Sequence, residues 1–183
     1  NKKDFMWLVA FIIYAMVTFE LFNRPLLGPV RSLKIDFDDK IPFIKEFVIA
    51  YHTFMPMIAL VGILLFTYDK ENYRRFIIAL FFAQTASYVT VLFFQTKVPR
   101  YDTSLLGNDF FSKMIKATYA LDNAYSGAPS MHVCNMVLSC LYFAKLKTKK
   151  SVKILVIVYM IFVALTTVFV KQHVFLDIPA GLI

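Results

Sequence analysis

Long runs of apolar residues dominate the chain, and short charged or polar segments separate them. The first five runs each reach about the 18 residues that mark a membrane-spanning helix. They cover approximately residues 5–22, 47–68, 76–96, 129–146 and 152–170. This pattern predicts an all-α polytopic membrane protein. Because 183 residues suffice for one compact bundle, we expect a single domain over residues 1–183.

A sixth helix is predicted at the end of the chain, where the apolar pattern resumes after residues 171–173. One uninterrupted helix from residue 152 onward would be about 50 Å long, whereas the hydrocarbon core is about 30 Å thick. We therefore place a turn at residues 171–173 and expect a six-transmembrane-helix bundle. Ten residues follow this turn. They correspond to about 15 Å of helix, so the last helix is expected to be truncated here and to continue beyond this sequence.

The longest connector, residues 97–128, has a pattern of its own. Apolar side chains recur there near helical spacing, at Phe110, Phe111, Met114, Ile115 and Tyr119. This spacing is typical of an amphipathic helix. We therefore expect a short helix that lies at the membrane interface between the third and fourth spans.

Composition agrees with this architecture and changes how the charge is interpreted. Hydrophobic residues make up 59% of the chain, and the mean hydropathy is +0.63. A net charge of +8 would suggest a nucleic-acid partner in a soluble protein, but the basic residues here lie between the spans. Membrane orientation and attraction to acidic lipid explain them better. The expected partner is the lipid bilayer, and no nucleic-acid partner is predicted.

Short basic loops predict the orientation of the bundle. Residues 145–153 form the most lysine-dense stretch, and residues 69–75 contain Lys70, Arg74 and Arg75. Such loops favour the cytoplasmic side. We expect a cytoplasmic N terminus, extracytoplasmic connectors after spans one, three and five, and a bacterial-type plasma membrane as the location.

Two motifs at the edges of apolar runs combine histidine with polar partners. The sequence Gly-Ala-Pro-Ser-Met-His, residues 127–132, opens the fourth run. The sequence Lys-Gln-His-Val-Phe-Leu-Asp, residues 171–177, follows the fifth. Odd-numbered spans end on the face where even-numbered spans begin. Both motifs, and the basic residues after span three, are therefore expected on one side of the membrane.

The second motif predicts an oriented histidine. His173 and Asp177 are four residues apart and would meet on one face of a helix. The carboxylate would accept a hydrogen bond from one imidazole nitrogen, fix the tautomer and leave the other nitrogen free to attack phosphorus. His132 would protonate the departing alkoxide and later take a proton from water or an alcohol.

Candidate phosphate ligands accompany these three residues. Lys97, Arg100 and Lys171 supply cations for the non-bridging oxygens of a phosphate ester. Ser130 places a hydroxyl in the first turn of span four, where free N–H groups and the helix dipole favour an anion. This arrangement requires no metal, and no cofactor is predicted.

At these residues the chain resembles the type-2 phosphatidic acid phosphatase superfamily, which includes lipid phosphatases, sphingomyelin and inositol phosphorylceramide synthases, and vanadium haloperoxidases. The family motif Pro-Ser-Gly-His is matched by residues 129–132, with Met131 at the glycine position. The motif Ser-Arg, five residues, His, three residues, Asp is matched in spacing by residues 166–177, without the arginine. The motif Lys, six residues, Arg-Pro survives only as Arg100.

These departures predict substitutes for the missing charges. Lys171 lies one helical turn beyond the position of the missing arginine, and Lys97 lies one turn beyond that of the missing lysine. The pattern is similar to the inositol-phosphotransferase-type branch of the family. The resemblance covers about residues 40–183 and agrees with the six-span layout.

The resemblance implies an activity and a set of residue roles. His173 would form a phosphohistidine, with Asp177 as its partner and His132 as acid and base. The implied phosphate ligands are Arg100, Lys171, Ser130 and Lys97. The implied reaction is hydrolysis of a lipid phosphate of the phosphatidic acid, phosphatidylglycerol phosphate or polyprenyl diphosphate type.

Two other functions stay open at this point. The same covalent intermediate could pass a phospho-headgroup to an alcohol, as in inositol phosphorylceramide or sphingomyelin synthases, because water and alcohol differ only in which one attacks the phosphohistidine. A non-catalytic lipid transporter could instead use the cations only to bind headgroups. Residue spacing alone does not separate these three functions.

Other polar residues have simpler interpretations. His52 lies inside the second span without a motif, so we expect a hydrogen-bonded packing role. Asp36, Asp38 and Asp39 could form a cation site, but a solvated loop is the preferred interpretation. His-x-x-x-Asp and Pro-Ser-x-His each occur on ordinary helices as well, so the catalytic interpretation depends on both occurring together.

Overall fold

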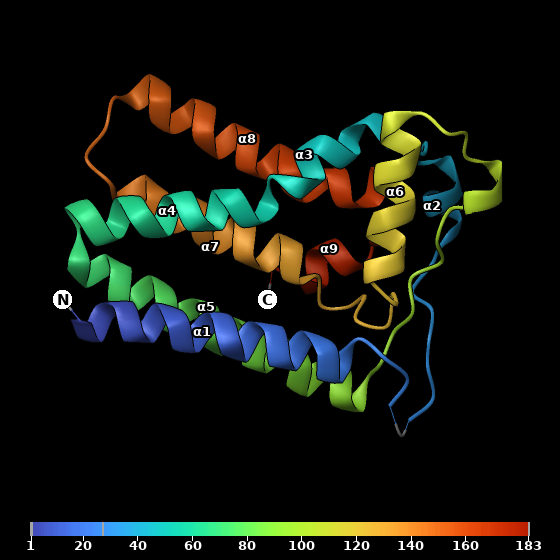
Figure 1. The fold of residues 1–183 in the computed structure, drawn as a ribbon, viewed down its shortest axis with the longest axis horizontal. Coiled ribbons are helices and arrows are strands. Elements are labelled where there is room, and N and C mark those ends of the chain that lie inside the picture. The colour runs from blue at the N-terminus through green and yellow to red at the C-terminus, as the bar shows by residue number, and fades with distance from the viewer. Residues whose placement is uncertain (1, 27, 183) are drawn as a thin grey trace.

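The structure, a computed structural model, describes residues 2–26 and 28–182. Five long helices run along its long axis (Figure 1). They are α1 (Lys2–Phe22), α4 (Phe54–Tyr68), α5 (Lys70–Phe93), α7 (Met131–Lys145) and α8 (Lys150–Phe169). The shorter elements are α2 (Asp36–Lys40), η1 (Lys45–Phe47), α3 (Val48–His52), η2 (Thr103–Leu105), α6 (Phe110–Leu121) and α9 (Asp177–Ala180). The predicted all-α class is confirmed.

Among the residues that the structure describes, four helical segments are long and apolar enough to cross a membrane, judged by length and composition. They are Asp4–Phe22, Lys45–Tyr68, Lys70–Phe93 and Lys150–Phe169. The predicted fourth span is α7, whose 15 residues make roughly 22 Å of helix. Within the described residues, the region of the predicted sixth span holds the four-residue helix α9, which is too short to cross a membrane, so a sixth span stays a prediction. The chain is an integral membrane protein with several spans.

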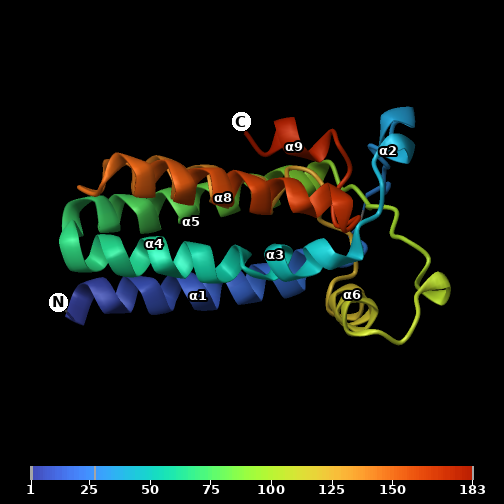
Figure 2. The same cartoon turned by 90° about the horizontal axis from the view of Figure 1, so that it is seen from above.

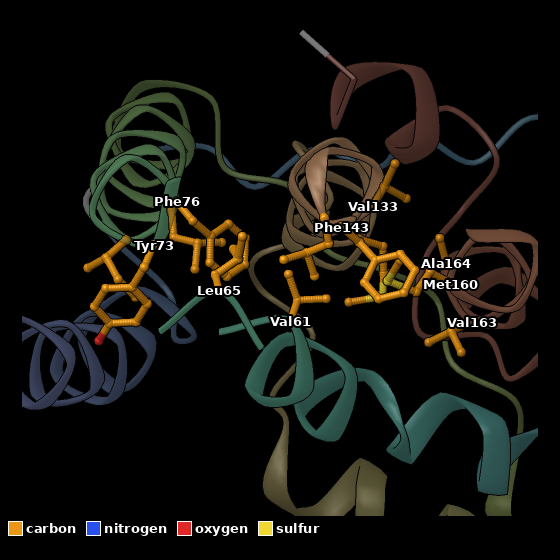
Figure 3. Packing of buried hydrophobic residues seen from close by; sticks show 13 residues of the cluster. Val61, Leu65, Tyr73, Phe76, Val133, Phe143, Met160, Val163 and Ala164 are labelled. Carbon is orange, nitrogen blue, oxygen red and sulfur yellow. The ribbon is translucent and has the colours of Figure 1, made fainter. Parts of the chain in front are cut away.

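Helix α7 is central because it packs against α4, α5 and α8. Figure 3 shows side chains from these four helices meeting in one cluster. Leu65, Phe76, Phe143 and Met160 are buried in it. The outer faces of the helices are also apolar, and Leu155 on α8 is 70% exposed. Lipid tails are as apolar as these side chains, so close van der Waals packing holds the helices together.

Helix α1 lies at the edge of the bundle beside α5 (Figure 1). Polar side chains join the two helices. Gln84 donates a hydrogen bond to the Thr18 hydroxyl at 2.8 Å, and the hydroxyls of Tyr14 and Thr85 are 2.7 Å apart. Hydrogen bonds between membrane helices satisfy groups that lipid cannot, so these contacts help to fix α1 in place.

The second predicted span bends at Thr53, which separates α3 from α4. Pro56 has no N–H to bond with the carbonyl of His52, and its ring would clash with that carbonyl in a continuous helix. Figure 1 shows α3 turned away from the axis of α4. The bend places Tyr51 and His52 in the wall of the cavity described below.

Helix α6 crosses one end of the bundle and is seen almost end-on in Figure 2. Ile115 is buried against Val170, at the end of α8, whereas Phe110 is 64% exposed. The Asp109 carboxylate accepts a backbone N–H of the first turn and caps the helix. The predicted amphipathic helix is confirmed, and its position at a membrane interface stays a prediction.

The segments that carry the two motifs meet at the end of the bundle opposite the N terminus (Figure 1). Helices α5 and α8 end there, and α7 begins there. Isolated β-bridges from Thr96 to Arg31 and to Ser126 join the connector after α5 to the connector after α1 and to the one before α7. The prediction that these segments share one end is confirmed. The lysine-rich loop between α7 and α8 lies at the other end.

Candidate active site

Two imidazole rings from distant parts of the chain meet at this end. His132 lies in the first turn of α7, and His173 lies in the turn between α8 and α9. His132 Nδ1 and His173 Nε2 are 3.0 Å apart, which is hydrogen-bond distance. The predicted convergence of the two histidines is therefore confirmed in position.

Asp177 contacts His173 through a turn and not along a helix face. His173 Nδ1 is 3.0 Å from Asp177 Oδ2, and the Val174 N–H donates to the same oxygen at 3.0 Å. The predicted pairing is present, but the predicted helical geometry is wrong because α9 begins only at Asp177. A carboxylate on Nδ1 leaves Nε2 of His173 as the nitrogen that can react.

The direct contact between the two rings closes the space around this nitrogen. In-line attack requires phosphorus between His173 Nε2 and the departing oxygen that His132 would protonate. The two ring nitrogens would then be roughly 5 Å apart, because a phosphoryl group and one hydrogen bond must fit between them. A rotation of the His132 side chain toward the neighbouring cavity would provide this space.

The loop before α7 passes close to Asp177. A Cβ atom on Gly127 would lie 2.8 Å from Thr96 Oγ1, 2.8 Å from Val98 Cγ2 and 3.3 Å from Asp177 Oδ2. Thr96 Oγ1 also accepts the Ala128 N–H at 2.8 Å. Position 127 therefore needs glycine, because any larger residue would displace the loop that carries the first motif against the second.

Ser130 has a structural contact in place of the expected phosphate contact. It precedes α7 as the N-cap residue, and its Oγ accepts the Val133 N–H at 3.3 Å. The side chain is fully buried and does not line the cavity. Its backbone N–H donates to the Asp177 carbonyl at 3.3 Å. As a phosphate ligand, Ser130 stays a prediction.

Arg100 is the predicted cation that reaches the cavity. Its guanidinium donates to Asp122 Oδ2 at 2.7 Å and to the Lys171 carbonyl at 3.2 Å, and it lies over the Tyr119 ring at 4.9 Å. Burial raises the pKa of Asp122, but the Arg100 charge and several hydrogen bonds outweigh burial, so this pKa lies below the ordinary 3.8. A phosphate that binds Arg100 would share it with Asp122.

The ammonium group of Lys171 is directed away from the histidines. Its Nζ donates to the carbonyls of Asp38 at 3.0 Å and Ile41 at 2.7 Å, and its backbone φ of 53° turns the chain after α8. Burial lowers the pKa of this amine. In this arrangement the side chain holds the connector before α3, so as a phosphate ligand that replaces the missing arginine, Lys171 stays a prediction that needs a rotation of the side chain.

Asp38 supports the same turn from the other side. Its carboxylate accepts the Phe175 N–H at 2.7 Å and the Ile35 N–H at 2.9 Å. The expectation of a solvated loop is wrong for Asp38, which is 6% exposed, whereas Asp36 and Asp39 are exposed. The connector therefore fixes the turn that carries the reactive histidine.

Lys97 also lies outside the cavity lining. Its Nζ is 5.0 Å from the centroid of the Tyr125 ring, a cation–π distance. Its backbone N–H bonds to the Arg31 carbonyl at 2.8 Å. As a phosphate ligand it stays a prediction that needs a rotation of the side chain.

A cavity of about 420 Å³ lies beside the histidine pair. Its polar wall includes Arg100, Asp122, Asn135, Gln172, His52, His132 and His173. His52 also has the hydrogen bond expected of it, 2.9 Å from the Thr118 hydroxyl. The apolar wall includes Met16 on α1 and Met55 on α4, which are 66% and 64% exposed. This wall reaches the lipid-facing surface.

The family comparison agrees with this geometry. A family model described as the PAP2 superfamily matches residues 23–183. The chain belongs to the PAP2 superfamily. Searches of curated proteins and of solved structures found no match. The resemblance inferred from the motifs is confirmed, and the match begins before the boundary near residue 40 that the motifs suggested.

Membership in the PAP2 superfamily supports the conclusion that the protein is an enzyme of the phosphatase or phosphotransferase type that acts on a lipid phosphate. The motifs did not predict Asp122, Asn135 or Gln172, which line the cavity beside the histidines. Gln172 adjoins His173, and Asn135 lies one helical turn after His132, so spacing could have indicated both. Asp122 has no such pattern.

Within the described residues, no three His, Cys, Asp or Glu side chains gather around a potential metal position.

Proposed function

We propose that this PAP2 superfamily protein is a lipid phosphatase that hydrolyses a lipid phosphate through a phosphohistidine at His173. The observation that carries the proposal is that Asp177, His173 and His132 lie in one line, with 3.0 Å at each step, so that a rotation of His132 would admit phosphorus between the two rings. This line provides an orienting carboxylate, a nucleophile and a proton carrier in the order that the reaction needs.

In the first step, His173 Nε2 forms a bond to phosphorus as the bond from phosphorus to the lipid oxygen breaks. His132, protonated at this stage, donates its proton to that oxygen, and the lipid alcohol leaves. The Nδ1–H of His173 donates to Asp177, which stabilises the positive charge that develops on the ring. Asp177 is fully buried, so this interaction is little screened by solvent.

In the second step, water attacks phosphorus and gives a proton to His132. The bond between nitrogen and phosphorus breaks, and inorganic phosphate leaves. His132 is then protonated for the next cycle. Attack by an alcohol would follow the same path and give a phosphoester, which is the phosphotransferase alternative.

Arg100 is the proposed ligand for the non-bridging oxygens. Charge is spread over these oxygens as phosphorus passes through its transition state, and a fixed guanidinium stabilises it. The ion pair with Asp122 and the contact with the Lys171 carbonyl hold the guanidinium in one orientation. That orientation would be ready before substrate arrives.

The proposed substrate is a phospholipid or polyprenyl phosphate that reaches the cavity from the bilayer. The exposed methionines of the apolar wall support this route because they face the position of lipid tails. The basic loops lie at the opposite end of the bundle, so we place the N terminus in the cytoplasm and the site on the extracytoplasmic face.

Release of inorganic phosphate from phosphatidic acid by the purified protein tests the proposal. The His173→Ala and His132→Ala variants are expected to lose at least about 10³-fold in kcat/KM, whereas His52→Gln, which alters the third histidine, should lose far less. Vanadate should inhibit the wild type, because it resembles five-coordinate phosphorus. Phosphate release that survives His173→Ala would refute the phosphohistidine. Binding of lipid phosphate without turnover would favour the transporter alternative.

A further inference from the structure

Two buried amide side chains in the cavity have no part in the proposed phosphate chemistry. Gln172 is 2% exposed and Asn135 is 6% exposed, and both line the cavity beside the histidines. Within the described residues, neither polar atom of the Gln172 amide has a hydrogen-bond partner, and the Asn135 Oδ1 atom has none either. Buried polar atoms are almost always paired in proteins, so these amides indicate a ligand.

The chemistry of the unpaired atoms restricts that ligand. Gln172 Oε1 and Asn135 Oδ1 are acceptors and need a proton donor. A phosphate dianion offers only acceptor oxygens, so it could accept from the unpaired Gln172 NH₂ group but would repel these two oxygens. A hydroxyl group donates one hydrogen bond and accepts others, and so it matches an amide that presents both a carbonyl oxygen and an NH₂ group.

The positions of the two amides relate this ligand to the reacting phosphate. Gln172 directly precedes His173, and Asn135 follows His132 by three residues on α7, about one helical turn deeper. A group bound by both amides would therefore lie next to the phosphorus. Arg100, which is charged, remains the partner for the phosphate itself.

We propose that Gln172 and Asn135 form a hydroxyl-binding subsite for a polyol group adjacent to the phosphate. This inference rests on the proposed function of the same site. The hydroxyls have two sources that share one chemistry. They belong either to the headgroup of the lipid phosphate or to an alcohol that replaces water in the second step. In the latter case the alcohol oxygen bonds to phosphorus, the bond to nitrogen breaks, and the alcohol proton passes to His132.

The experiment compares two ratios in the purified full chain. The first is kcat/KM for phosphatidylglycerol phosphate, whose leaving group carries a hydroxyl beside the phosphate, over kcat/KM for phosphatidic acid. The second is glycerol phosphate formed over inorganic phosphate released when phosphatidic acid is cleaved in the presence of glycerol. The variants are Gln172→Met and Asn135→Leu. Gln84→Met is the matched control, because Gln84 lines the same cavity but already donates to Thr18.

A subsite that binds hydroxyls should lower one ratio by at least about tenfold in both variants, because an unpaired amide discriminates strongly between a hydroxyl and its absence. Loss in the first ratio assigns the hydroxyls to the headgroup, and loss in the second assigns them to an acceptor alcohol. The control should change neither ratio. A wild type without preference in either ratio, or variants that keep the wild-type ratios, would overturn the subsite while leaving the phosphatase intact.

A thermal-shift titration makes the same comparison without turnover. Phosphatidylglycerol phosphate, or phosphatidic acid together with glycerol, should raise the melting temperature of the wild type more than phosphatidic acid alone. Gln172→Met should remove this difference. Equal shifts in the wild type would overturn the subsite. If the wild type releases no phosphate from phosphatidic acid but the shifts in melting temperature are unequal, the proposed function is refuted and the subsite is retained.

Discussion

The substitution Asp38→Asn tests whether a connector far from the reaction holds the reactive histidine in place. Both carboxylate oxygens of Asp38 accept backbone N–H groups, one from Phe175 in the turn after His173 and one from Ile35. Asparagine keeps one side-chain oxygen and places an NH₂ group against the other N–H. One of the two hydrogen bonds is therefore lost, and two donors face each other.

The magnitude follows from the charge and burial of this group. A hydrogen bond to a charged group contributes about 1.5–3 kcal/mol, and Asp38 is only 6% exposed. The turn that contains His173 and Phe175 either packs against Asp38 or comes away from it. Loss of one such bond, about 2 kcal/mol, shifts the equilibrium between these two states by about 30-fold toward the unpacked turn. Only the packed turn presents His173 to phosphorus, so kcat should fall by up to about 30-fold, with a smaller change in KM.

The assay is steady-state phosphate release from phosphatidic acid, together with the inhibition constant for vanadate. Asp36→Asn is the matched control, because Asp36 lies on the same short helix and is exposed. Its effect on stability should stay within about 0.5 kcal/mol. The inhibition constant should rise in the Asp38 variant and stay unchanged in the control. Equal kcat values and equal vanadate inhibition for the two variants would refute a positioning role for Asp38.

Three further predictions concern the rest of the site. Gly127→Ala should cost about 1–3 kcal/mol of stability and lower kcat, whereas Gly28→Ala, whose Cβ meets nothing within 4 Å, should change neither. Ser130→Ala removes the cap of α7 and should cost about 1 kcal/mol in thermal unfolding. The pKa of Asp122 is depressed when folded, so its ion pair with Arg100 should stabilise the protein above about pH 3.8 and lose this effect as the pH falls further.

Each of these predictions has a contrary outcome. Equal thermal stability of the two glycine variants would show that the loop before α7 has room to move. A Ser130→Ala variant that unfolds like the wild type but loses phosphate affinity would restore Ser130 as a phosphate ligand. An Asp122→Asn variant with the same acid-unfolding profile as the wild type would exclude the ion pair as the cause.

The features that sequence could predict are those set by local pattern. The long apolar runs gave α1, α5 and α8, and alternation of spans placed His132 and His173 at one end. The resemblance to the PAP2 superfamily followed from two short motifs at these residues. The helices and the family resemblance both depend on the spacing of residues along the chain, and this spacing can be read from the sequence directly.

The remainder depends on contacts between distant segments. The Lys171 side chain reaches the Ile41 carbonyl across 130 positions in sequence, and the Asp38 carboxylate reaches Phe175 across 137. No periodicity encodes such partners, so Lys171 was expected at the phosphate and Asp38 in solvent. The turn between α8 and α9 was placed correctly, but the geometry of the His173 contact inside it depends on this same packing.

In the proposed reaction His173 becomes covalently phosphorylated while His132 transfers the proton. Brief incubation with lipid labelled at the phosphate, followed by denaturation and peptide mapping, measures this directly. The proposed mechanism predicts an acid-labile, base-stable phosphoryl group on the peptide that contains His173. Because His132 acts in both steps, the mechanism also predicts slower formation and slower loss of this intermediate in His132→Gln, and none in His173→Gln. Turnover by the wild type with no trapped phosphoryl group, or with the label on another residue, would contradict a phosphohistidine at His173.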